Sequence, residues 1–318
     1  MNKFIYIFFA IIIFTGCYFY RNIVLNKEMT EMLAARDFFN LEIALKKSSS
    51  QLSDINKLYF KAYVESAFNE TEQSLQTIDM LFSLHKKSLN NVIIFNLLIL
   101  KHNNHLRQFE YKKATETWYA ALDLLKTYKI LDSEKQEALI IQLQGYESLK
   151  DVPPQKLFHN TDAIIPVKND ENGHLSMQVI CNDVTEEFVF DTGFVYSAVA
   201  ESVASRMGIR PLDGSTQIIT ATGKFVEVKM SVADNLRIGD LLFENVVFYI
   251  LPDEELTWPE KNFKLSGIIG LSLIGQMKEI RIDHQAGNIV VPQTPVKRDL
   301  RNLFWDNNGS SMYSITGY

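Results

Sequence analysis

The chain has 318 residues, 47% of them hydrophobic, which is enough material for two domains with ordinary cores. Its formal net charge is -6 and no basic run stands out, so we expect no nucleic acid partner. The two cysteines, Cys17 and Cys181, are too few for a fold built on disulfide bonds.

Residues 1–21 have the pattern of an export signal. Lys3 supplies a positive charge, an apolar run extends from Phe4 to Thr15, and small residues precede Cys17. The segment resembles a bacterial lipoprotein signal, which implies lipidation of Cys17. The alternative is an uncleaved membrane anchor, because apolar character continues to Tyr20 and gives 17 residues from Phe4. Both alternatives place the rest of the chain in a bacterial cell envelope, at a membrane surface facing away from the cytoplasm.

Residues 27–150 are predicted to form an all-helical domain. They contain one glycine and no proline, and their apolar residues recur at spacings of three and four. Residues 111–122 resemble the second helix of a tetratricopeptide repeat (TPR), with small Ala114 and Ala121 beside Trp118. We therefore expect a TPR-like array of helical hairpins that binds a protein partner or presents substrate. The expected helices are 28–47, 51–67, 70–85, 89–106, 109–127 and 132–147.

Two histidines in this region invite comparison with a metal site. His102 and His105 lie three residues apart on an expected helix, a spacing at which both could ligate one ion. Polar neighbours, including Lys101 and Arg107, instead favour a solvated helix face, and no acidic or cysteine ligand is nearby in sequence. We expect no metal.

A boundary follows at Pro153 and Pro154, because paired prolines cannot continue a helix. The chain then changes to short apolar or alternating runs separated by turn residues. Many short strands with two small helices predict a compact, partly open β-barrel over residues 158–295, followed by a C-terminal tail, 296–318. The expected strands are 164–167, 175–180, 187–190, 216–220, 225–230, 235–238, 246–251, 280–282 and 288–291.

One buried strand of this region ends in an acidic turn. The run from Phe188 to Phe190 is apolar and leads directly into Asp191, Thr192 and Gly193. Burying a carboxylate at the end of such a strand is costly unless the charge has a use. The tripeptide alone is weak evidence, because a simple strand-ending turn has the same composition.

Two neighbouring segments strengthen the case. Ser197 is followed by a short helical pattern from Ala198 to Ile209. About 80 residues after Asp191 an apolar pair, Ile268 and Ile269, is flanked by Gly267 and Gly270. In this order the two motifs resemble the retropepsin-like aspartic proteases. The resemblance covers residues 160–295 and implies an α+β multidomain chain, in which an all-α helical-hairpin domain precedes an all-β retropepsin-like acid protease barrel.

The resemblance implies a hydrolase that cleaves peptide bonds without a cofactor. Direct attack of water on a peptide carbonyl needs a base and an acid, and two adjacent carboxylates that share one proton supply both. Only one Asp-Thr-Gly is present, in a domain half the size of a two-lobed aspartic protease. We therefore expect a homodimer through the protease domain that pairs Asp191 with its copy on a two-fold axis.

The resemblance also assigns supporting roles. Thr192 would hydrogen-bond across the axis, and Gly193 would let backbone approach the aspartates and a peptide or protein substrate. Residues 218–228 correspond to the flap hairpin that closes over substrate. The supporting set is Thr192, Gly193, Ser197, Ile268, Ile269 and Gly270, and the substrate or flap set is Phe194, Ala221, Thr222, Gly223 and Lys224.

One residue departs from the family pattern. Phe194 stands where most relatives have alanine or serine, and a phenyl ring there could narrow the cleft or block access. The alternative to a membrane-anchored endopeptidase is therefore an inactive retropepsin-like scaffold lipoprotein that acts through its helical domain. Asp283 could be offered as a second carboxylate, but a turn before the strand at Asn288 explains it.

Overall fold

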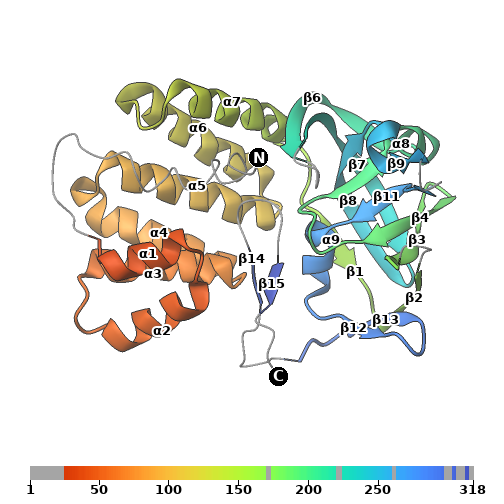
Figure 1. The fold of residues 1–318 in the computed structure, drawn as a ribbon, viewed down its shortest axis with the longest axis horizontal. Coiled ribbons are helices and arrows are strands. Elements are labelled where there is room, and N and C mark those ends of the chain that lie inside the picture. Colours follow the sequence, from red (N-terminus) through yellow and green to blue (C-terminus); the bar gives the residue numbers. More distant parts are fainter. Residues whose placement is uncertain are drawn as a thin grey trace. The chain divides into compact units, whose positions relative to one another are not determined.

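The computed structural model describes residues 25–169, 173–219, 224–259, 263–296, 303–305 and 312–314. The chain divides into two compact units between Tyr146 and Glu147. The first unit is helical and the second is rich in strands (Figure 1), which confirms the predicted α+β organisation. The predicted export segment with Cys17, and the flap residues Ala221, Thr222 and Gly223, lie outside the described residues.

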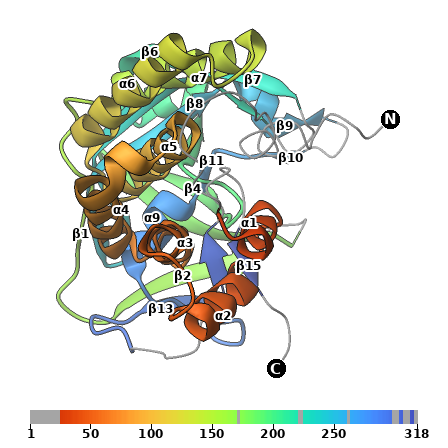
Figure 2. The ribbon, with the colours of Figure 1, turned by 90° about the vertical axis from the view of Figure 1, so that its left-hand side faces the viewer.

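The helical unit is built from seven helices in the part of the chain that the structure describes. They follow one another in chain order through the unit (Figures 1 and 2), and their buried apolar faces form its core. None of the helices within the described ranges is both long and apolar enough for a bilayer span. The helices are α1 (Lys27–Ala34), α2 (Phe38–Ser48), α3 (Asp54–Ala67), α4 (Thr71–His85), α5 (Asn91–Arg107), α6 (Tyr111–Tyr128) and α7 (Ser133–Glu147), and a 3-10 turn covers Lys86–Ser88.

Three helical hairpins share one turn geometry. In each, a residue with left-handed backbone ends the first helix: Arg36 (φ 58°), Asn69 (φ 61°) and Phe109 (φ 58°). Its N–H donates to the carbonyl three residues back, and the next N–H donates to the carbonyl five residues back. The turn at Arg36 divides residues 28–47 into α1 and α2, so the prediction of one helix there is wrong. The hairpin array is thus regular, while the tetratricopeptide name stays a prediction.

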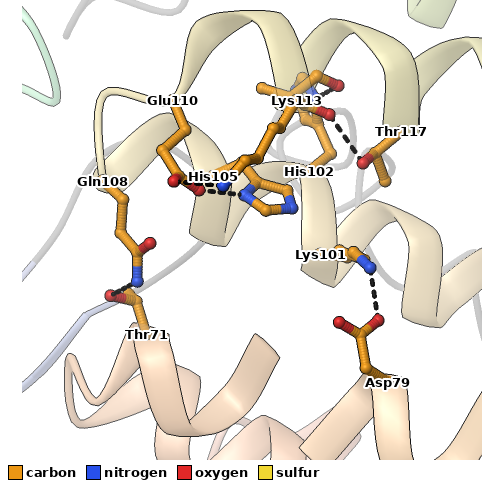
Figure 3. A network of polar contacts seen from close by, with 10 residues as sticks. Thr71, Asp79, Lys101, His102, His105, Gln108, Glu110, Lys113 and Thr117 are labelled. Atoms are coloured by element: carbon orange, nitrogen blue, oxygen red, sulfur yellow. Dashed lines mark hydrogen bonds and ion pairs between the residues drawn. The ribbon is translucent and has the colours of Figure 1, made fainter. Parts of the chain in front are cut away.

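Both histidines of α5 are buried, so the prediction of a solvated face is wrong. The His102 Nδ1–H donates to the Ala114 carbonyl at 2.9 Å, and its ring packs 4.6 Å from that of Trp118 between centroids. Nδ1 of His105 lies 2.7 Å from Oε2 of Glu110 (Figure 3). The polar neighbours misled the prediction because α5 is covered on several sides, including the face that carries the histidines. No cluster of three metal-ligating side chains occurs among the described residues.

Acid is expected to destabilise the helical unit between pH 6.5 and 4. Burial lowers the pKa of His102 from 6.5 to about 4, and its Nε2 has no hydrogen-bond partner among the described residues. Below pH 6.5 His102 is protonated in the unfolded chain but stays neutral in the folded chain until the pH approaches 4. The contribution of neutral His102 to the stability of the helical unit is therefore complete above pH 6.5 and is lost as the pH falls through 4. The free energy of unfolding falls by about 3 kcal/mol in total. Denaturant unfolding at pH 7 and pH 4.5, followed by tryptophan fluorescence, measures it.

His102→Gln is the matched control for that experiment, because an amide keeps a donor but does not titrate. Its stability should change less than that of the wild-type chain between the two pH values. Equal acid losses in both chains would show that His102 is not the group responsible.

The C-terminal residues add a short hairpin to the helical unit. Strand β14 (Leu303–Trp305) pairs antiparallel with β15 (Met312–Ser314). The Phe304 ring lies edge-on to Phe38, at 5.1 Å between centroids, and to Phe39 at 5.9 Å. Part of the predicted C-terminal tail therefore contributes to the core of this unit.

The β-rich unit contains one large sheet of eleven strands. The strand order is β12-β13-β2-β3-β4-β11-β5-β8-β7-β6, and β1 pairs with β8. A further pairing of Ile180 in β3 with Arg237 in β7 joins two distant strands of this path, so that the sheet closes on itself as a barrel. The strands are β1 (Lys156–Phe158), β2 (Ala163–Asn169), β3 (Leu175–Cys181), β4 (Val184–Phe190), β5 (Ser197–Ala200), β6 (Arg210–Ile219), β7 (Phe225–Ile238), β8 (Leu241–Leu251), β11 (Gly267–Ile269), β12 (Arg281–Asp283) and β13 (Asn288–Val291).

Two local predictions in this unit need correction. The helical pattern expected from Ala198 to Ile209 begins inside the buried strand β5, and helix α8 covers only Glu201–Arg206. Four consecutive buried residues are compatible with either element, and the pairing of β5 with β8 and β11 decides for a strand. Residues 235–238, expected as a separate strand, are the end of the long strand β7.

Candidate active site

Asp191 lies at the point where β4 leaves the barrel core. Phe188 and Val189 are buried in β4, and the side chain of Asp191 is half-buried at its end. The backbone N–H of Asp191 donates to the carbonyl of Ile269 at 3.0 Å, which extends the β4–β11 ladder by one bond. The backbone of the acidic residue is therefore fixed by the sheet.

The carboxylate itself is held by the turn that follows. The N–H of Gly193 donates to Oδ1 of Asp191 at 2.7 Å. Thr192 and Gly193 are exposed. Oδ2 of Asp191 has no hydrogen-bond partner among the described residues, so one oxygen is positioned and the other is open to a further group.

Strand β11 supports this turn from within the sheet. It lies between β4 and β5, which are consecutive in the chain, and it runs parallel to β4 and antiparallel to β5. Ile268 pairs with Val189 on one side and with Ala198 on the other. The structure thus brings together the two motifs that sequence analysis paired at long range.

The loop after Asp191 is fastened to the residues that follow β11. The carbonyl of Phe194 accepts the N–H of Leu271 at 2.7 Å, and that of Val195 accepts the N–H of Ser272 at 2.8 Å. The hydroxyl of Ser197 accepts the N–H of Gly270 at 3.1 Å. These bonds satisfy N–H groups at the start of helix α9 (Leu271–Ile274) that a helix leaves without partners.

Both glycines that flank the apolar pair are required by close packing. A Cβ built on Gly270 would lie 2.3 Å from the carbonyl oxygen of Tyr196 and 2.7 Å from that of Phe194. One built on Gly267 would lie 2.4 Å from the ring of Phe188 and 2.7 Å from the carbonyl oxygen of Ala198. Neither site has room for a side chain, and at Gly270 the obstacles are backbone atoms that cannot rotate away.

Residues 177–273 match the family model described as aspartyl protease. The matched range begins in β3 and ends in α9, so it contains both halves of the site described above. The β-rich unit therefore contains a domain similar to the aspartyl proteases. The resemblance inferred from the two motifs is confirmed at this level.

Solved structures that are similar to part of this chain come from a bacterium, a plant and a protozoan. A retropepsin-like aspartic protease from Rickettsia conorii is 19% identical, with a TM-score of 0.28 over 43% of this chain and 90% of that one. The retroviral protease-like domain of Ddi1 from Leishmania major is 15% identical, with a TM-score of 0.22 over 46% and 97%. Basic 7S globulin from soybean is 13% identical, with a TM-score of 0.31 over 42% and 51%. A search of curated proteins found no match.

Phe194 of the protease domain packs against a tyrosine from β8. Its ring lies edge-on to that of Tyr249, with 6.2 Å between centroids, and Tyr249 also contacts the ring of Tyr196 at 5.2 Å. The phenyl ring that sequence analysis singled out is therefore one member of an aromatic group beside the aspartate turn. Sequence reasoning missed Tyr196 and Tyr249, and the only signal was the presence of a tyrosine inside each apolar run.

Only Lys224 of the predicted flap set is described besides Phe194. It is exposed, precedes β7 and forms an ion pair with Glu255 in the 3-10 turn Asp253–Leu256. In the same turn Asp253 accepts the N–H of Ser202 at 2.9 Å and an ammonium hydrogen of Lys264 at 3.0 Å. The hydrogen bond from Ser202 is the main cause that lowers the pKa of Asp253 to about 2. Neither Asp253 nor Glu255 was singled out from sequence, because acidic residues in a turn are common on any surface.

Proposed function

We propose that this chain is a membrane-anchored, extracytoplasmic aspartic endopeptidase that works as a homodimer. The observation that carries the proposal is the carboxylate of Asp191, which is fixed on the β4–β11 ladder, accepts one N–H through Oδ1 and leaves Oδ2 open. Such a carboxylate needs a second one to divide the roles of base and acid. Among the described residues no other carboxylate contacts it, so the partner is Asp191 of a second copy.

In the proposed dimer the two turns meet on a two-fold axis. The paired carboxylates share one proton, because two like charges a few ångströms apart do not both ionise. One takes a proton from water while the other protonates the peptide carbonyl oxygen. Thr192 is exposed next to Asp191 and is free to bond across the axis, while Gly193 presents bare backbone to the substrate.

The location in the proposal rests on sequence. The apolar run that begins at Phe4, the small residues before Cys17 and the following helical unit fit an envelope protein held by its N-terminus. A peptide substrate would lie extended in the cleft and pair with it through main-chain hydrogen bonds. The regular hairpin array in residues 27–128 gives the helical unit a surface for a protein partner or for substrate presentation.

Mixing wild-type chains with Asp191→Asn chains tests the shared site. If one aspartate from each copy is needed, only wild-type homodimers cleave. Cleavage per wild-type chain should then fall to about one half in an equal mixture and to about one quarter at one wild-type chain in four. A random peptide mixture, supplied in excess and read by mass spectrometry for new termini, measures the rate.

Cleavage per wild-type chain that stays constant at every mixing ratio would overturn the symmetric site. No cleavage by wild-type chains alone would instead favour the scaffold alternative, in which the domain only binds peptides.

A further inference from the structure

The helical unit has two chemically different ends. Successive helices are antiparallel, so one end carries the left-handed turns at Arg36, Asn69 and Phe109. The other end carries the start of α1 and the connections α2–α3, α4–α5 and α6–α7. We call residues 25–28, 46–57, 84–90 and 126–133 the lysine end, and residues 33–38, 66–72 and 106–113 the turn end.

The lysine end is strongly positive and the turn end is balanced. The lysine end contains eight lysines against three acidic residues, Glu28, Asp54 and Asp132, whereas the turn end contains four basic and four acidic residues. Lysine at a helix C-terminus complements the helix dipole, but one charge per terminus is enough for that. Here three helix ends carry two exposed lysines each: Lys46 and Lys47, Lys86 and Lys87, Lys126 and Lys129.

Most of these lysines have no carboxylate partner. Lys46 pairs with Glu42 at 2.8 Å, but the other five exposed lysines of the three pairs form no ion pair with any described residue. Positive charges that lack carboxylate partners repel one another unless an anionic surface is present. The charge of the lysine end therefore favours an external partner that is negative.

Apolar side chains are exposed among the lysines. Leu84 is the last residue but one of α4 and is 65% exposed, two and three residues before Lys86 and Lys87. Tyr128 is 54% exposed at the end of α6, next to Lys129. Leucine and tyrosine surrounded by lysines suit the boundary between lipid headgroups and acyl chains. A soluble polyanion would satisfy the lysines but would leave these two side chains in water.

The route of the chain points to the same partner. The apolar residues that begin at Phe4 end at Tyr20, and six residues separate them from Lys27 at the start of α1. Six extended residues span at most about 20 Å. With the N-terminal segment in a bilayer, the lysine end is the part of the helical unit tethered closest to the headgroups.

We propose that the lysine end docks on the anionic headgroups of the membrane that holds the N-terminus. The ammonium groups contact lipid phosphates, while Leu84 and Tyr128 enter the interface. Docking turns the end with Arg36, Asn69 and Phe109 away from the bilayer. The inference rests on the anchoring in the proposed function and is independent of peptide cleavage.

The test uses the full chain in vesicles of phosphatidylcholine alone or of phosphatidylcholine with phosphatidylglycerol. Flotation first shows whether the chain is anchored in both. Lysines are then acetylated with a water-soluble reagent and quantified by mass spectrometry. On anionic vesicles we expect Lys86 and Lys87 to be acetylated at about one fifth of their rate on neutral vesicles, or more slowly still. High salt should restore the rate, because it screens the attraction between the lysines and the headgroups. Lys112 and Lys113 at the turn end should react equally on both.

A double variant separates docking from general shielding. Lys86→Gln with Lys87→Gln should weaken docking roughly 25-fold, at about fivefold per lysine, so Lys46, Lys47, Lys126 and Lys129 regain reactivity. Lys112→Gln with Lys113→Gln is the matched control, a pair of exposed lysines at the other end, and should change nothing.

Equal acetylation of the lysine end on both kinds of vesicle would overturn docking, and so would equal protection of both ends. A chain that fails to float on neutral vesicles contradicts the anchor, and the labelling on anionic vesicles then still decides for or against docking. A chain that docks but does not cleave peptides contradicts only the protease function.

Discussion

Asp191→Asn is expected to reduce peptide cleavage by roughly 10⁴-fold or more, because the amide can neither accept a proton from water nor share one with its partner. Folding should be retained. Asparagine has the shape of aspartate and its Oδ1 can still accept the N–H of Gly193. Cleavage of a random peptide mixture and the circular dichroism spectrum measure the two effects.

Asp283→Asn is the matched control in the same domain. Asp283 is exposed and its Oδ1 accepts the N–H groups of Gln285 and Ala286 at 2.9 Å, so it stabilises the turn between β12 and β13. This role agrees with the turn predicted from sequence and gives it no part in catalysis. Full activity of Asp191→Asn, or loss of activity in Asp283→Asn with normal folding, would contradict the assignment.

Gly270→Ala is expected to lower the free energy of unfolding of the protease domain by about 3 kcal/mol, near the top of the usual range for overpacking. The new methyl group would lie 2.3 Å from the carbonyl oxygen of Tyr196. Relief requires moving the backbone of either β11 or the aspartate loop, and both carry the bonds that position Asp191. The midpoint of thermal unfolding should fall by roughly 10 °C, and cleavage should fall as well.

Ser272→Ala, two residues later, is the control for Gly270→Ala. The hydroxyl of Ser272 is buried and has no hydrogen-bond partner among the described residues. Its removal should change stability by at most about 0.5 kcal/mol and leave the N–H bond to Val195 in place. An unchanged unfolding midpoint in Gly270→Ala would show that β11 and the aspartate loop are less tightly packed than the structure indicates.

The long-range part of the site was predictable because its residues have few other uses. An acidic residue after the buried strand from Phe188 to Phe190, and an isoleucine pair between two glycines, are each unusual. Their resemblance to a family joined them across the chain, and the structure places Ile269 in hydrogen-bond contact with Asp191. The periodicity of residues 51–147 likewise located five of the predicted helices. In α3 to α6 the buried residues recur at helical spacing.

What sequence could not give depends on tertiary contacts. His102 is surrounded by polar residues along the chain, yet it is buried by Trp118 and Tyr146 from two later helices. Arg36 ends a helix through a left-handed conformation for which arginine has no preference. The strand assigned to Ser197–Ala200 depends on partners in β8 and β11 that lie far ahead in sequence. For His102 and for the strand at Ser197–Ala200, a neighbour distant in the chain overrides the local pattern. At Arg36 the hydrogen bonds of the turn hold a conformation that arginine does not prefer.

The position of β11 between β4 and β5 also sets the order in which the site can form. During synthesis, β4 and Asp191 leave the ribosome long before Ile269. The position between β4 and β5 cannot be filled until β11 has been synthesised. Contacts between such distant segments form slowly, because the intervening chain must be closed into a loop. A nascent or truncated chain that ends before Gly267 therefore contains the aspartate but not its support. The support of Asp191 is therefore complete only when nearly the whole domain has been made.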